Sequence, residues 1–201
     1  GKAELFGLLF QHVRLFTEHV NVTFDKEKMF MQSMDSARVS VFELSLPATW
    51  FDSYNHTGAS AITLGIPATM LFKILNTRDK SQYTEIIYNT DDDKLLINFS
   101  SNNASVFNKR FELPLIDLDC DLMAIPETES EAEFSIDSAI FSNLINQLKI
   151  FGDTIEIQCT EEKITLHSIS VEAGKMVVDI NIDDLTEYSI TEGEVMKLSF
   201  S

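Results

Sequence analysis

A segment near the start of the chain occurs again 135 residues later, and this repeat limits what the chain can fold into. Residues 141–169 align with residues 6–34 without a gap. In each copy an apolar stripe with helical spacing comes first, and alternating apolar positions typical of strands follow it. The two helical stripes are Phe6, Leu9, Phe10, Val13 and Phe16, and Phe141, Leu144, Ile145, Leu148 and Phe151. The repeat therefore predicts an α+β chain in which one helix-and-sheet unit is present twice.

Short alternating segments after each helix predict the strands of the two units. In the first copy we expect strands at about residues 20–24, 28–33, 38–46 and 60–66. Pro67 suits the first position of a second short helix, and further strands are expected at about 83–88, 94–99 and 105–116. In the second copy the expected strands are at about 155–159, 163–168, 175–182, 185–190 and 195–200.

The same pattern divides the chain into a first domain at residues 1–118, a connecting loop at 119–133 and a second domain at 134–201. The loop carries Pro126 and many carboxylates, and it has no sustained periodicity. The stripe of Met196, Leu198 and Phe200 corresponds to that of Ile62, Leu64 and Ile66. The second copy thus ends where the first continues with a helix and three strands, so we expect the C-terminal part of the second domain to be missing.

Composition supports a folded chain with no membrane partner. Hydrophobic residues make up 44% of the 201 positions, which is enough for a genuine core. No apolar run approaches the roughly 18 residues of a membrane span, and no signal peptide is visible, so a soluble intracellular protein is expected. Cys120 and Cys159 lie far apart without metal-ligand spacing, which favours reduced thiols. The formal charge of -17 argues against simple electrostatic adhesion to nucleic acid.

Common catalytic motifs are absent from the sequence, which carries no phosphate-binding glycine loop, no nucleophile elbow and no zinc-protease helix. The four histidines have no carboxylate or nucleophile at a telling distance. Asp117, Asp119 and Asp121 alternate as strand residues would, and they keep open a remote alternative, a metal-dependent hydrolase. Their position at the exit into the acidic loop favours solvation. We therefore expect no enzyme, no cofactor and no metal.

Five short segments carry a resemblance to a known family. They are Met31-Gln-Ser-Met-Asp-Ser36, Val39-Ser-Val-Phe-Glu-Leu44, Phe51-Asp-Ser-Tyr54, Leu115-Ile-Asp-Leu-Asp119 and Ile125-Pro-Glu127. In this order and spacing they resemble the eukaryotic sliding clamps of the proliferating cell nuclear antigen family. Lys73-Ile-Leu75 and Gly152-Asp153 also fit the family, and the resemblance covers nearly the whole chain.

The resemblance implies a DNA clamp fold, in which three chains with two similar domains each close into a ring around duplex DNA. Such a ring gives processivity to DNA polymerase and tethers replication and repair proteins without catalysing a reaction. The implied partners are double-stranded DNA, DNA polymerase, a clamp loader and proteins with a peptide motif, in a homotrimer. The implied location is the nucleus, or a viral replication compartment for a viral member. Encirclement also reconciles the acidic charge with DNA, because only the surface toward the hole needs to be positive.

The resemblance also implies roles for particular residues. The DNA-facing residues would be Arg14, Lys73, Arg78 and Lys149. The groove for partner peptides would include Met34, Met123, Ile125 and Pro126. The subunit interface would join a strand at about residues 106–113 to one at about 175–182, with the interface residues Val106, Lys109, Phe111, Leu113, Lys175, Val177 and Asp179.

The chain departs from the family in two respects. The helices that should face DNA carry few cations, since the first offers Arg14 beside Gln11, His12, Thr17 and Glu18, and the third offers Lys149 beside Asn143, Asn146 and Gln147. The C-terminal part that normally supplies the other wall of the partner groove is missing. The chain is thus interpreted as a fragment or as a divergent, viral clamp, and a subunit of a heterotrimeric checkpoint-type clamp is the alternative.

Overall fold

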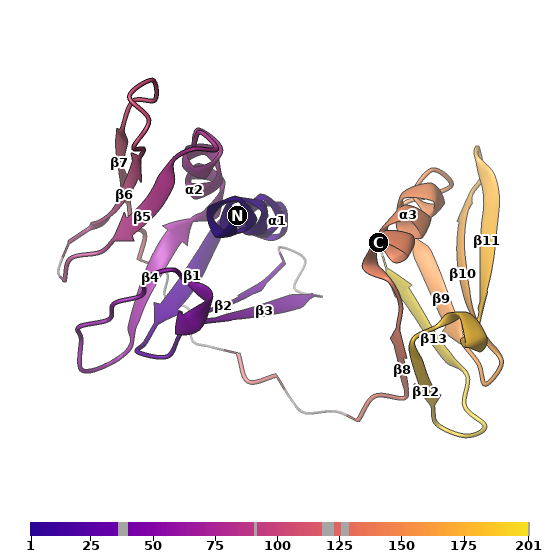
Figure 1. The fold of residues 1–201 in the computed structure, drawn as a ribbon. Coiled ribbons are helices and arrows are strands. Elements are labelled where there is room, and N and C mark those ends of the chain that lie inside the picture. Colours follow the sequence, from indigo (N-terminus) through magenta and orange to yellow (C-terminus); the bar gives the residue numbers. More distant parts are fainter. Residues whose placement is uncertain (36–39, 91, 118–122, 126–128, 201) are drawn as a thin grey trace. The chain divides into compact units, whose positions relative to one another are not determined.

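The computed structural model describes residues 1–35, 40–90, 92–117, 123–125 and 129–200. The chain divides into two compact units, Gly1–Ala124 and Ile125–Ser201, and each is an α+β unit with its own core (Figure 1). The division falls within the predicted connecting loop. None of the helices among the described residues is both long enough and apolar enough to cross a membrane.

The first unit is built on a four-stranded antiparallel sheet with two helices. The strand order is β3 (Val41–Pro47), β2 (Lys28–Met34), β1 (His19–Phe24) and β4 (Ile62–Pro67). Helices α1 (Lys2–Phe16) and α2 (Ala68–Leu75) pack against each other and share the core of this sheet. The core side of the sheet and the helices contributes the fully buried residues Phe10, Val22, Met31 and Leu71.

A second sheet extends the first unit beyond β4. Its strand order is β5 (Tyr83–Ile87), β6 (Lys94–Ser100) and β7 (Lys109–Pro114), all antiparallel. Ile97 and Phe99 of β6 are fully buried and belong to the same core as the helices. The backbone N–H of Ile116 donates to the carbonyl oxygen of Gly65 at 2.9 Å, which joins the segment after β7 to β4.

The second unit repeats the helix and the four-stranded sheet. Its strand order is β11 (Gly174–Asn181), β10 (Lys163–Ser170), β9 (Ile155–Cys159) and β13 (Met196–Phe200), and α3 (Ser138–Leu148) packs on the core. The side chain of Asp137 starts α3, since it accepts from the backbone N–H groups of Ala139 and Ile140. A separate pair, β8 (Ala132–Ser135) and β12 (Glu187–Ile190), completes the unit.

Equivalent residues of the two units form equivalent strand pairs, which confirms the duplicated pattern. Ile62 lies opposite Phe24 in the first sheet, and Met196 lies opposite Cys159 in the second. Each sheet also has a one-turn 3-10 helix at the corresponding place, Ala48–Trp50 and Ile182–Asp184. The agreement of strand order, register and short helices shows that the 135-residue offset reflects one supersecondary unit used twice.

A tyrosine holds the first hairpin turn of each unit. The hydroxyl of Tyr54 lies 2.7 Å from the carbonyl oxygen of Asp25 and 2.8 Å from that of Lys28. The hydroxyl of Tyr188 donates to the carbonyl oxygen of Thr160 at 2.7 Å. The carbonyls of Asp25 and Thr160 lie at turns where the strand ladder ends, and the tyrosine hydroxyl gives each a donor. The Lys28 carbonyl also accepts from the Asp25 N–H at 3.1 Å.

The structure differs from the sequence-based expectations at two strands. The strand expected at 105–116 begins only at Lys109, because Val106 lies in a turn in which its N–H donates to the carbonyl oxygen of Asn103 at 3.0 Å. The predicted connecting loop ends earlier than expected, since residues 132 and 133 belong to β8. The alternating acidic residues there resemble a solvated loop, but Phe134 of the same strand packs against the second core.

Strands β4 and β13 occupy equivalent positions but differ in burial. Leu64 and Ile66 of β4 are 5% and 2% exposed, whereas Leu198 and Phe200 of β13 are 48% and 49% exposed. In the first unit α2 and the second sheet contribute to the core over β4. The described part of the second unit has no counterpart of these elements, so the apolar side chains of β13 remain open to solvent.

The turn-holding role of Tyr54 predicts a measurable loss of stability. Tyr54→Phe removes the hydroxyl donor and should lower the free energy of unfolding of the first unit by about 1 kcal/mol. Urea denaturation followed by fluorescence measures this, because Trp50 is the chain's single tryptophan and packs against Phe6 and Phe51. The matched control is Tyr83→Phe, since Tyr83 is 67% exposed on β5. Equal midpoints for the two variants would contradict the role of Tyr54.

Candidate functional site

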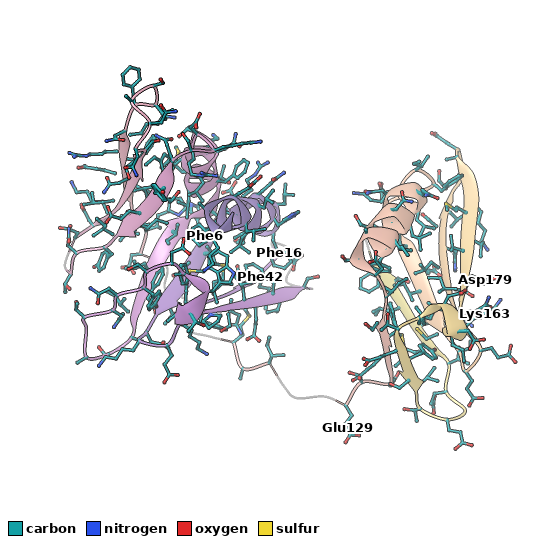
Figure 2. The ribbon with its side chains drawn as sticks, viewed as in Figure 1. Phe6, Phe16, Phe42, Glu129, Lys163 and Asp179 are labelled. Carbon is teal, nitrogen blue, oxygen red and sulfur yellow. The ribbon has the colours of Figure 1, made fainter. Side chains whose placement is uncertain are left out.

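After the exposed Lys2 and Glu4 of its first turn, the solvent side of α1 is mostly apolar, although the family resemblance assigns this helix to DNA. Phe6, Phe10 and Val13 bury the core side of the helix. The opposite side carries Leu5, Leu8 and Leu15, which are 55%, 46% and 73% exposed, and His12 lies between the last two in the sequence. Phe16 at the end of the helix packs edge-on against Phe42 of β3, with 5.0 Å between ring centroids (Figure 2). This face offers phosphates little charge.

Arg14 uses its guanidinium group largely within the protein. The group lies over the ring of Phe72 on α2, 4.3 Å from the ring centroid. The Nε atom is buried and has no hydrogen-bond partner among the described residues. The cation–π contact joins α1 to α2 and partly desolvates the charge. The sequence alone did not indicate this contact, because Phe72 is distant along the chain.

The other predicted DNA-facing cations fall into two kinds. Arg78 is half-buried, and its Nη1 donates to the carbonyl oxygens of Asp79, Lys80 and Gln82 at 3.0, 3.4 and 2.9 Å, which holds the turn after α2. Lys73 on α2 and Lys149 at the end of α3 are exposed and make no ion pair within the described part of the chain. Of the four predicted DNA-facing residues, Lys73 and Lys149 are therefore the ones whose charge remains available to a phosphate.

The predicted partner groove is described in part. Met34 at the end of β2 lies opposite Val41 of β3, and Val41 is 39% exposed. Met123 lies at the same sheet, because its backbone forms two hydrogen bonds with the side chain of Gln32. Ile125 is 49% exposed but belongs to the second unit, and residue 126 lies outside the described residues. The sequence alone did not indicate that Val41 and Gln32 lie beside these residues, because only the strand register and the hydrogen bonds place them there.

The two strands predicted at the subunit interface both lie at sheet edges. β7 is the last strand of the order β5-β6-β7, and β11 is the first of the order β11-β10-β9-β13. In β7 the side chain of Leu113 is buried in the core, and the Lys109 ammonium group donates to the carbonyl oxygen of Thr77. Of the predicted set, Val106 lies before the strand. A partner strand at β7 would therefore pair mainly with the backbone N–H and C=O groups along the outer edge of β7.

The outward residues of β11 are charged or apolar in alternation. Lys175, Val177 and Asp179 point away from the second core, and Val177 is 49% exposed. Asp179 accepts from the Thr165 hydroxyl at 2.7 Å and pairs with Lys163 at 3.0 Å on the neighbouring strand (Figure 2). These hydrogen bonds, first that of Thr165 and then that of Lys163, lower the pKa of the Asp179 carboxyl. The carboxylate is thus held within its own sheet.

A groove of about 390 Å³ runs between α2 and the edge strand β7. Helix α2 and the turn after it line the groove with Met70, Lys73, Ile74 and Thr77, and β7 lines it with residues 111–114. Met70 is 48% exposed there. The groove combines an apolar floor with two exposed charged residues, Lys73 and Glu112, and it lies directly beside the strand edge that the family resemblance assigns to the interface.

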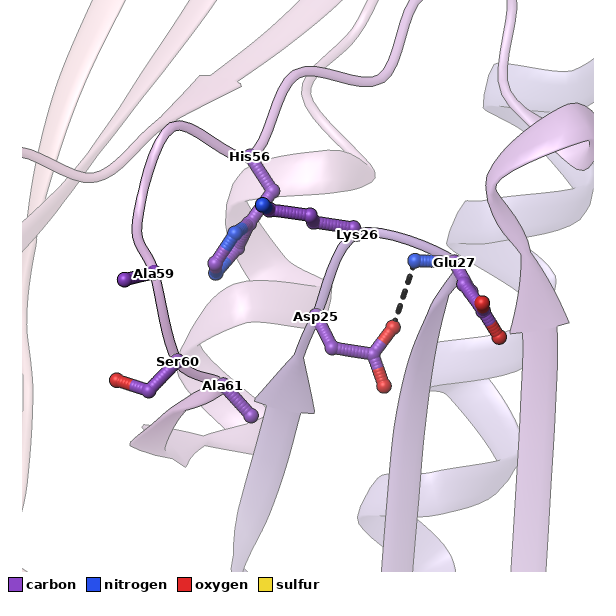
Figure 3. A pocket seen from close by; sticks show the side chains of 7 residues that line it. All are labelled: Asp25, Lys26, Glu27, His56, Ala59, Ser60 and Ala61. Atoms are coloured by element: carbon purple, nitrogen blue, oxygen red, sulfur yellow. Dashed lines mark hydrogen bonds between the residues drawn. The ribbon is translucent and has the colours of Figure 1, made fainter.

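A smaller hollow of about 230 Å³ lies beside the turn between β1 and β2 (Figure 3). Asp25, Lys26 and Glu27 line one side, and His56 with residues 59–61 lines the other. The Asp25 carboxylate accepts from the backbone N–H groups of Glu27 and Lys28 at 2.7 and 2.8 Å. These backbone hydrogen bonds, chiefly that of Glu27, lower the pKa of Asp25. The carboxylate therefore stabilises the turn between β1 and β2.

The described residues contain no group of histidine, cysteine and carboxylate side chains that could hold a metal ion. Asp117 is described, whereas residues 119 and 121 of the remote hydrolase alternative lie outside the described residues. His167 pairs with Glu156 across neighbouring strands at 3.0 Å. Cys159 is a buried free thiol, and burial raises its pKa. The His167–Glu156 pair joins β10 to β9, and Cys159 belongs to the core of the second unit.

Comparison with known proteins identifies the family. The family model described as "Proliferating cell nuclear antigen, N-terminal domain" matches residues 1–122. The chain is 26% identical over 182 residues to the "Probable DNA polymerase sliding clamp 2" of Paramecium bursaria Chlorella virus 1, covering 90% of this chain and 64% of that protein. It is 25% identical over 163 residues to the "Proliferating cell nuclear antigen" of Saccharomyces cerevisiae, covering 81% of this chain and 62% of that protein. The chain therefore belongs to the proliferating cell nuclear antigen family, and it spans less than two thirds of the length of these two relatives.

The fold is that of a sliding clamp. The crystal structure of the proliferating cell nuclear antigen of Thermococcus kodakaraensis matches with a TM-score of 0.84 at 18% identity, covering 98% of this chain and 78% of that one. The predicted DNA clamp fold and the predicted family are thus confirmed. The roles of the individual residues stay predictions.

The contact of Arg14 with Phe72 predicts a structural effect of removing the arginine. Arg14→Ala should lower the free energy of unfolding of the first unit by about 0.5–2 kcal/mol, because the variant removes both the cation–π contact and the packing of the side-chain stem. Urea denaturation followed by Trp50 fluorescence measures the change. Lys73→Ala is the matched control, since Lys73 is exposed. If Arg14→Ala unfolds at the wild-type midpoint, the contact does not stabilise the unit.

Proposed function

We propose that this chain is a subunit of a sliding clamp, a ring that encircles duplex DNA and tethers DNA polymerase and other replication or repair proteins. Membership of the family, together with a helix-and-sheet unit present twice, is the observation that carries the proposal. Two similar units in each chain suit a ring built from repeated segments. The relatives named above are a sliding clamp of DNA polymerase and a proliferating cell nuclear antigen.

A clamp acts by topology, so the proposed role involves no catalysis, no cofactor and no metal. Encirclement keeps a ring on DNA without strong attraction between the two, which suits a chain with a formal charge of -17. Lys73 and Lys149 are the proposed contacts with phosphates, while Arg14 contributes less because its charge lies over Phe72. The proposed site of action is the nucleus, or a viral replication compartment.

Ring closure is proposed to join the β7 edge of one chain to the β11 edge of the next, in a homotrimer. Both edges present backbone N–H and C=O groups that a further strand can satisfy. The groove between α2 and β7 lies beside this joint and exposes Met70 to apolar side chains of the adjoining chain. A heterotrimer with related subunits is the second candidate, since the same edges would serve it.

Partner proteins are proposed to bind at the outer face of β2 and β3. Met34 and Val41 form an apolar pair there, with Met123 nearby. Methionine side chains adapt to differently shaped apolar groups, which suits a site that receives several partners. The polymerase, the clamp loader and proteins with a peptide motif are the proposed occupants.

If copies of this chain alone close the ring (self-closure), they should form an oligomer of defined size that depends on the β11 edge. Sedimentation equilibrium should show a concentration-dependent species of three times the 22.7 kDa chain mass. Val177→Asp adds a charge at this edge and should shift the equilibrium to monomer. The matched control is Val171→Asp, at a fully exposed valine beyond the end of β10. A strict monomer at every concentration would refute self-closure, and a trimer unaffected by Val177→Asp would exclude this edge.

The thin positive charge predicts weak binding to linear DNA with a small salt dependence. Lys149→Ala should lower the slope of log affinity against log salt by about 0.9 for each phosphate that the variant no longer neutralises, and Arg14→Ala should lower it less. Fluorescence anisotropy of a labelled linear duplex at several salt concentrations measures both slopes. Lys26→Ala, in the turn between β1 and β2, is the control. Wild-type affinity for the Arg14→Ala/Lys149→Ala double variant would remove both residues from the DNA-facing set.

A further inference from the structure

Gln32 is a buried polar residue on the outer face of the first sheet. Along β2 the side chains of Met29 and Met31 enter the core, so Gln32 and Met34 lie on the opposite face. A side chain on that face would normally be solvated, but Gln32 is only 7% exposed. A buried carboxamide requires hydrogen-bond partners, and it finds them at Glu43 on the neighbouring strand and, 91 residues away, at Met123 of the connecting loop.

Three hydrogen bonds fix the carboxamide of Gln32. Its Nε2 donates to the carbonyl oxygen of Met123 at 2.9 Å and to Oε1 of Glu43 at 2.7 Å. Its Oε1 accepts from the backbone N–H of Met123 at 2.7 Å. The orientation of the amide is unambiguous, because a carboxylate and a carbonyl can only accept and a backbone N–H can only donate. The reversed amide would face three mismatched partners.

One side chain thus satisfies both backbone groups of Met123. A carboxamide carries the same donor and acceptor as a peptide group, so Gln32 serves Met123 as a neighbouring strand would. The loop is held against the sheet without forming a strand itself. Because the amide is buried, water competes little for these bonds, and breaking them leaves unpaired groups.

We propose that Gln32 is a positioning residue that holds the connecting loop, at Met123, on the outer face of β2. Met34 is two residues further along the same face, about 7 Å away. Val41 lies opposite Met34. The amide therefore fixes Met123 beside this apolar pair. Its consequence for partner binding rests on the proposed function: a loop held in place presents a preformed wall to an extended apolar segment of a partner, which lowers the ordering cost of binding.

Hydrogen exchange at the Met123 amide tests the positioning role. Gln32→Met keeps the length of the side chain and removes all three hydrogen bonds, so the Met123 amide should exchange roughly tenfold faster. Gln32→Glu is a second variant. Its carboxylate can still accept from the N–H of Met123, but it cannot donate to the Met123 carbonyl, and it would face the carboxylate of Glu43. Gln158→Met, on β9 of the other unit, is the matched control and should leave Met123 unchanged. Trp50 fluorescence verifies that the first unit, which contains Met123, is folded in each variant.

An unprotected Met123 amide in the wild-type protein, or wild-type exchange in Gln32→Met, would overturn the positioning role. This result does not depend on any partner, so it is decided separately from the proposed function. The second measurement uses a peptide selected from a random library on the wild-type chain, whose binding Met34→Glu abolishes. Its affinity should fall roughly fivefold in Gln32→Met. Unchanged affinity with faster exchange would overturn the link to binding, and failure to select any such peptide would count against the proposed groove alone.

Discussion

Burial of a helix stripe against a four-stranded antiparallel sheet is the constraint on which each unit depends. Phe6, Phe10 and Val13 of α1 can leave water only if β1 and β2 present Val22 and Met31 to them. The same requirement recurs at α3, where Leu148 is fully buried against its sheet. Most residues proposed for function lie outside these layers, on strand edges, outer faces and exposed helix sides, although Leu113 is buried in the core and Phe111 packs against it. The core can therefore persist while those surfaces diverge.

Local periodicity was sufficient to predict the elements of this core. The stripe of α1 and the alternation of β1 and β2 each depend on neighbours within a few residues, so the sequence carries them openly. Strand β8 was missed because its partner β12 lies more than 50 residues further along the chain. Its glutamates also suggested a solvated loop. Long-range pairing of this kind decides whether an ambiguous segment becomes a strand.

The candidate sites were harder to predict, because contacts between distant residues determine what a side chain can do. Arg14 and Arg78 are both arginines near helix ends, yet one lies over Phe72 and the other holds three carbonyls of its own turn. Gln32 looked like part of a family segment, but its contact with Met123 depends on where the connecting loop runs. A buried glutamine is used similarly at Gln82, which accepts from Asp79 N–H and donates to the Phe107 carbonyl. In both cases a glutamine carboxamide pairs with backbone N–H and C=O groups, as the backbone of a neighbouring strand would.

The different burial of β4 and β13 affects which of these two strands unfolds locally first. A strand whose apolar side chains already contact water loses little when it detaches, so the free energy of its local opening is small. Leu198 and Phe200 are half-exposed, whereas Leu64 and Ile66 at the equivalent position are nearly fully buried. Within the described residues, backbone amides of β13 should therefore exchange with solvent sooner than those of β4.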